Sequence, residues 1–161
     1  IACDKKQQEA ILSLLVHGAD SLIKNKKEER PAENNPDLKF FITTILSEKK
    51  AFKALKEEKR QKLKLIFAEV DKEGKNVIDL TRSKEINMFT EKEISEEEAL
   101  KDAQDFISSV ALCNKATVNL DEWLFAFGKL AATEPKILNR FIDDFEQATT
   151  TKGSFGLFKP Q

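Results

Sequence analysis

Two stretches decide the fold of this chain: Asp71-Lys72-Glu73-Gly74-Lys75-Asn76-Val77-Ile78-Asp79, and Thr117-Val118-Asn119-Leu120-Asp121-Glu122-Trp123. Each lies between segments whose apolar residues recur at three- and four-residue steps, which indicates a helix on either side of a polar loop. Each loop carries a β-branched residue near its end, Ile78 or Val118, and these two lie one helix–loop–helix unit apart. We therefore expect two such units whose loops pair through a short β contact between Ile78 and Val118.

The segment from Leu63 to Leu130 resembles a degenerate pair of EF-hands, the helix–loop–helix units that bind calcium. With Ile78 and Val118 at the paired position of each loop, the resemblance implies these weak metal-ligand candidates: Asp71, Glu73 and Asp79 in the first loop, and Glu122 in the second. Lys75 and Arg82 stand at two further ligand positions of the first loop. The resemblance thus implies a scaffold that has lost tight calcium binding, with a weak calcium or divalent-ion buffer as an alternative.

The composition favours an all-α protein. The 161 residues include 40% hydrophobic and 34% charged residues but only 5 Gly and 4 Pro. This balance suits one compact domain under a charged surface. The net charge of −1 gives no reason to expect a nucleic-acid partner. No apolar run is long enough to predict a transmembrane helix. The predicted fold is an EF-hand-like pair plus additional N-terminal helices in a single compact domain.

We divide the chain into an N-terminal helical region over residues 1–60, the EF-hand-like pair with a final helix over 61–147, and a tail over 148–161. In the first region an amphipathic helix is expected from Asp4 to Lys24, in which Gly18 either ends the helix or only weakens it. A polar linker follows, and Asn35-Pro36 has the composition of a helix start.

Two capping boxes precede the third helix of the pair, one at Thr90 to Glu93 and one at Ser95 to Glu98, and one of them is expected to start it. The tail has the composition of turns, and we expect it to be loosely held. Its apolar residues either dock back onto the chain or form a partner motif: Phe155, Leu157 and Phe158.

The helix after the second loop is the most hydrophobic in the chain. Its large apolar side chains cannot all face one side of a helix, so some must meet another element or a partner. They are the predicted partner-binding residues: Trp123, Phe125, Phe127 and Leu130. The partner is expected to be a protein helix, a lipid-like ligand or a second copy of the chain, which would make a homodimer.

The cysteines Cys3 and Cys113 are too far apart in the sequence for a CxxC motif, and they are disulfide candidates or free buried thiols. The chain begins at Ile1, which is expected for a chain processed by removal of a secretory signal and equally for a fragment. Ile1-Ala2-Cys3 also resembles the end of a lipoprotein cleavage box. A secreted protein is therefore expected, with a cytoplasmic or a lipid-anchored surface protein as alternatives.

No motif indicates an enzyme. The single histidine, His17, lies in a predicted helix, where a lone histidine is usually a surface or packed residue, and no phosphate-binding loop follows a predicted strand. We expect no cofactor beyond the weak calcium alternative. The sequence therefore favours a non-catalytic protein that binds a protein or another ligand, with a helical surface protein that binds host molecules as a second possibility.

Overall fold

The structure is a computed structural model that describes residues 5–20, 24, 26–28, 30, 34–47, 49–91, 93–113 and 116–155. This part of the chain is mostly helical, which confirms the predicted all-α class, and its two short strands form one sheet. The elements in chain order are α1 (Lys5–Val16), α2 (Pro36–Ser47), α3 (Lys49–Ala54), α4 (Glu57–Val70), β1 (Val77–Asp79), α5 (Leu80–Thr90), α6 (Glu96–Val110), β2 (Thr117–Asn119), α7 (Leu120–Thr133) and α8 (Pro135–Lys152).

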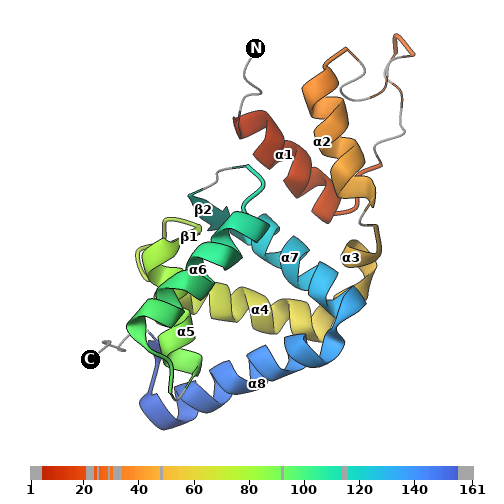
Figure 1. The fold of residues 1–161 in the computed structure, drawn as a ribbon. Helices are drawn as coiled ribbons and strands as arrows, with labels where there is room; N and C mark the ends of the chain where they lie inside the picture. Colours follow the sequence, from red (N-terminus) through yellow and green to blue (C-terminus); the bar gives the residue numbers. More distant parts are fainter. Residues whose placement is uncertain are drawn as a thin grey trace.

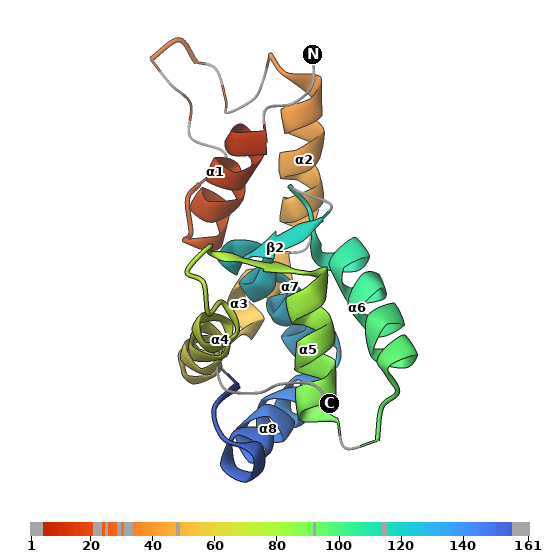
Figure 2. The ribbon, with the colours of Figure 1, turned by 90° about the vertical axis from the view of Figure 1, so that its left-hand side faces the viewer.

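Two helix–loop–helix units form the centre of the molecule. The first consists of α4, β1 and α5, and the second of α6, β2 and α7. Strands β1 and β2 pair antiparallel, and Ile78 lies opposite Val118, as the sequence predicts. Both side chains are fully buried. The short sheet therefore joins the two loops, and Figure 2 shows it between α4, α5 and α6.

The remaining helices cover the two ends of this centre. Helices α1 and α2 lie side by side at one end, and α8 runs across the other end beneath α4 (Figures 1 and 2). Helix α8 begins at Pro135, the first helical position that proline favours, directly after α7 ends at Thr133. Among the described residues, no helix has the length and apolar character needed to cross a membrane.

The helix boundaries follow local signals in the sequence. Gly18 has a φ of +88°, and the amides of Gly18 and Ala19 donate to the carbonyls of Leu15 and Leu14. This is the left-handed glycine cap that ends a helix, so α1 is shorter than the predicted range. Helix α2 starts where expected, because the Asn35 side chain accepts a hydrogen bond from the Leu38 amide at 3.1 Å.

The second of the two predicted capping boxes starts α6. Ser95 accepts from the Glu98 amide, and the Glu98 carboxylate accepts from the Ser95 amide. Thr90 instead ends α5, where its hydroxyl donates to the Ile86 carbonyl at 3.0 Å. The local chemistry of the two boxes is alike, so the position of the preceding helix decides between them.

Two apolar clusters form the core. The larger one lies between the two helix–loop–helix units and α8, and its largest members are Trp123, Phe67, Phe89, Phe127, Phe145 and Phe155. The smaller one joins α1 and α2 to α7, and its members include Leu12, Leu15, Ile42, Ile45, Ala51, Cys113 and Phe125. The N-terminal helices therefore pack on the side of α7 that carries Phe125.

Helix α3 crosses α7 at Gly128. A Cβ atom at this position would overlap the carbonyl oxygen of Ala51, so only glycine allows the two backbones to approach this closely. The contact fixes the N-terminal region against the second helix–loop–helix unit.

Candidate functional site

The first loop binds its own backbone through Asp71. The two carboxylate oxygens of Asp71 accept hydrogen bonds from the amides of Lys75, at 2.9 Å, and Asn76, at 2.6 Å. Asn76 has a φ of 58°, a left-handed conformation that asparagine tolerates better than most residues. The aspartate that would begin a calcium loop therefore organises the turn itself.

Two basic side chains of the chain neutralise Glu73. Its carboxylate lies 2.5 Å from the Lys75 ammonium and 3.3 Å from the Arg82 guanidinium. The hydrogen bond and charge of Lys75, followed by the charge of Arg82, lower the pKa of Glu73. Arg82 also pairs with Glu85 at 2.6 Å. A divalent cation that approached Glu73 would meet two positive side chains first.

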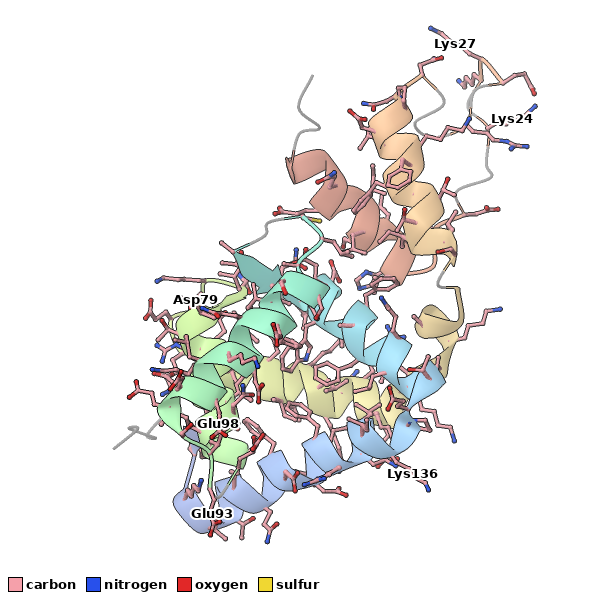
Figure 3. The ribbon with its side chains drawn as sticks, in the orientation of Figure 1. Lys24, Lys27, Asp79, Glu93, Glu98 and Lys136 are labelled. Carbon is pink, nitrogen blue, oxygen red and sulfur yellow. The ribbon has the colours of Figure 1, made fainter. Side chains whose placement is uncertain are left out.

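Asp79 caps the helix that leaves the first loop. Its carboxylate accepts a hydrogen bond from the Arg82 amide at 2.9 Å, at the start of α5. Figure 3 shows Asp79 on the outer edge of the molecule. Each of the three acidic candidates of the first loop is thus bonded to a group of the protein.

The second loop has a different arrangement, because Glu122 is buried, with 1% of its surface exposed. One carboxylate oxygen accepts from the amides of Leu112 and Cys113, each at 2.7 Å, and the other accepts from the Asn119 amide at 2.8 Å. The Asn119 side chain in turn accepts from the Glu122 amide at 2.9 Å. Glu122 therefore ties the beginning of the loop to its end.

The four metal-ligand candidates do not converge. Asp71, Glu73 and Asp79 belong to the first loop and Glu122 to the second. Within the described residues, no three histidine, cysteine, aspartate or glutamate side chains are grouped so that they could hold a metal ion. Loss of tight calcium binding remains a prediction, and these contacts provide its physical basis.

The apolar helix α7 offers less free surface than the sequence predicts. Trp123, Phe125 and Phe127 are buried, and Leu130 is half-buried against the larger cluster. The indole nitrogen of Trp123 donates to the Leu63 carbonyl at 3.2 Å, which ties α7 to α4. Burial therefore argues against Trp123, Phe125 and Phe127 as an open partner-binding face, and partner binding at the half-buried Leu130 stays a prediction.

The reason is that other segments of the chain cover α7 on opposite sides. Trp123 and Phe127 pack against the aromatic rings of α4, α6 and α8, and Phe125 packs among residues of α1, α2 and α3. The sequence indicates that the helix needs partners on more than one side. It does not indicate that both partners are intramolecular.

Cys113 is a free thiol inside the second loop. Burial, followed by the negative charge of Glu122 and a hydrogen bond to it, raises the pKa of Cys113 to about 12. The thiolate is the reactive form of cysteine, so this thiol is poorly suited to nucleophilic chemistry. The predicted disulfide of Cys113 is therefore not present in this structure, and Cys3 itself lies outside the described residues.

The C-terminal segment is held more firmly than the sequence predicts. Helix α8 continues to Lys152, and Phe155 is fully buried. The hydroxyls of Thr149, Thr150 and Thr151 donate to carbonyls of the preceding helical turn, so the three threonines remain helical. The prediction of a loosely held tail is wrong for residues 148–155, whereas Leu157 and Phe158 lie outside the described residues.

The sequence left open whether Phe155 packs back onto the chain or contacts a partner. The structure places it in the larger core cluster. Two long-range bonds at this end of the chain were not predicted. The Phe155 amide donates to Glu69 on α4, and the Lys152 ammonium donates to the Phe89 carbonyl on α5. No spacing or motif in the sequence links these residues to the tail, because the link depends on where α8 crosses the bundle.

Comparisons with models of known protein families, with curated proteins and with solved structures found no match for the chain.

Proposed function

We propose that this chain is a non-catalytic binding protein on an EF-hand-like scaffold that has lost tight calcium binding. Three features support the scaffold. Two helix–loop–helix units lie together, Ile78 pairs with Val118, and Asn76 adopts a left-handed conformation where a calcium loop usually has glycine.

The contacts of Glu122 carry the proposal. In a calcium loop, the last ligand is a glutamate that gives both of its oxygens to the metal. Here both oxygens already accept hydrogen bonds from backbone amides, and the carboxylate is buried. A calcium ion would have to replace these bonds, and the second loop offers no other carboxylate at its ligand positions to compensate.

A metal-independent loop leaves the helix pairs without a calcium switch. In calcium sensors, the ion changes the angle between the helices and exposes an apolar groove. In this chain, protein contacts set the loops and α8 covers the apolar side of the pair. The scaffold would therefore present to its partner a surface that calcium does not change.

A binding role fits the side chains better than a catalytic one. His17 is exposed, and its ring nitrogen lies 2.8 Å from the Ser13 carbonyl at the end of α1. The buried Cys113 thiol has a raised pKa. Neither is arranged as a nucleophile with a base, whereas α1 and α2 expose Leu14 and Phe40, the latter 75% exposed. We propose a protein surface as the partner of these apolar side chains.

Calcium titration by calorimetry tests the loss of metal binding. The unmodified chain should release no binding heat at micromolar calcium, and a dissociation constant below about 10 μM would contradict the proposal. The matched control is the double variant Lys75→Asp, Arg82→Glu, which restores acidic ligands to the first loop. It should bind calcium at least about a hundredfold more tightly than the unmodified chain.

A further inference from the structure

Residues 152–155 form a strap that joins the two helices of the first helix–loop–helix unit. The Lys152 ammonium donates to the carbonyls of Phe89, at 2.8 Å, and Met88, at 3.3 Å, at the end of α5. Two residues later, the chain bonds to Glu69 in the last turn of α4. The strap therefore joins the end of α4 that enters the first loop to the end of α5 that lies farthest from this loop.

Phe155 anchors the strap in the core. Its ring lies 5.2 Å from that of Phe89 and 6.0 Å from that of Phe145, measured between centroids. The Lys72 ammonium of the first loop lies 4.9 Å from the same ring. Because the side chain is fully buried, loss of the strap would expose Phe89 and Phe145 as an apolar pocket.

One carboxylate oxygen of α4 accepts hydrogen bonds from two neighbouring residues of the strap. Glu69 Oε1 accepts from the Ser154 hydroxyl at 2.8 Å and from the Phe155 amide at 2.8 Å. The exposed Ser154 and the buried Phe155 are thus tied to the same acceptor. A change at the exposed hydroxyl is transmitted directly to the residue that fills the pocket.

We propose that Ser154 is a phosphorylation site and that a phosphate at this position opens the strap. A protein kinase would transfer the γ-phosphoryl group of ATP to Ser154. The new bond joins Oγ to phosphorus, the bond from phosphorus to the bridging oxygen of ADP breaks, and the hydroxyl proton is released. The hydroxyl donor is then lost, and a group with a charge of about −2 lies against the Glu69 carboxylate.

The neighbouring hydroxyls lack this connection. Thr150 and Thr151 are also exposed, but their hydroxyls donate to the carbonyls of Glu146 and Gln147 in their own helix. Ser154 follows Gly153, which has a φ of +83° and lies outside the helix. Among these residues, Ser154 alone bonds to the acceptor that also holds Phe155.

Opening of the strap would give the scaffold a control that does not involve calcium. It would break the bonds from Ser154 and Phe155 to Glu69 on α4 and would uncover the pocket beside Phe89. This inference concerns the C-terminal strap alone, so it can fail while the proposed calcium independence holds, and the reverse is also true.

The test compares the full chain carrying phosphoserine at position 154 with the unmodified chain, with Thr151→Asp as the control for charge. Hydrogen exchange of the Phe155 amide is the measurement. We expect exchange at least about tenfold faster with phosphoserine at 154 and less than about twofold faster in the control, because only the first change reaches Glu69. Trp123 fluorescence and helix content should stay unchanged in both, which separates strap opening from unfolding.

Glu69→Gln distinguishes repulsion from simple loss of the hydroxyl. Its amide oxygen can still accept from the Phe155 amide but carries no charge, so phosphoserine at 154 should speed exchange much less in Glu69→Gln than in the chain with Glu69. Equal exchange in the phosphorylated chain and the unmodified chain, or equal acceleration in the Thr151→Asp control, would overturn the strap mechanism. Absence of phosphate on Ser154 in protein isolated from its own cells under phosphatase inhibition would overturn the modification.

Discussion

The first loop keeps its carboxylates near the surface, where Lys75 and Arg82 pair with Glu73, whereas the second loop buries its one carboxylate, Glu122, against three backbone amides. Both loops are paired through the same two-stranded sheet. Exposed ion pairs contribute little to stability because water screens them, whereas a buried carboxylate is costly to leave without partners. The comparison indicates that substitutions in the second loop should lower the stability of the fold more than substitutions in the first loop.

The largest effect should come from Glu122→Ala. It leaves the amides of Leu112, Cys113 and Asn119 without their acceptor, and we expect a loss of about 3–5 kcal/mol in the free energy of unfolding. Urea unfolding followed by Trp123 fluorescence measures it. The matched control is Asp121→Ala, which removes the same charge one position earlier and should cost less than about 1 kcal/mol. Equal losses in the two variants would contradict the structural role of Glu122.

The reaction rate of the Cys113 thiol should show whether the second loop is closed in the folded protein. With Cys3→Ser as background, Cys113 should react with a disulfide reagent at least about a hundredfold more slowly than in the unfolded chain, because its pKa is raised to about 12 and it is buried. Addition of Glu122→Ala should increase the rate, since it removes the neighbouring charge and loosens the loop. Fast reaction in the folded background protein would show that the second loop is open.

The pairing of the loops could be predicted from the sequence, whereas the covering of α7 could not. Ile78 and Val118 are β-branched residues near the ends of two polar loops that lie one helix–loop–helix unit apart, and this spacing predicts their pairing. The start of α2 is likewise encoded locally by Asn35 and Pro36.

Long-range contacts explain what the sequence did not reveal. Phe125 is buried because α1, α2 and α3 fold back from the N-terminal region, and Gly128 is required by a contact with Ala51. Glu69 is bonded to residues more than eighty positions away. The charges of Lys75 and Arg82 can be read from the sequence, whereas the amide contacts of Glu122 depend on the folded loop.

Two variants of the first loop should have intermediate effects. Asp71→Ala removes the acceptor for two loop amides, and Asp79→Ala removes the cap of α5. Each should cost about 1 kcal/mol in the free energy of unfolding, well below the cost of Glu122→Ala. Urea unfolding of the two variants under identical conditions measures the difference. A cost for either variant that equals the cost of Glu122→Ala would remove the contrast between the loops.

The smallest effect should come from Glu73→Gln. Glu73 is an exposed carboxylate, and contact with Lys75 and Arg82 lowers its pKa in the folded chain. A lowered pKa means that its contribution to stability is present above the pKa of the unfolded chain and is lost as the pH falls through the folded pKa. The difference in stability between the unmodified chain and Glu73→Gln should therefore be small at neutral pH, shrink in acid, and shrink in high salt as the charges are screened. Thermal unfolding at neutral and acidic pH, each at low and high salt, measures it. A difference that grew as the pH fell would mean that Glu73 is held in the loop by something other than its two basic neighbours.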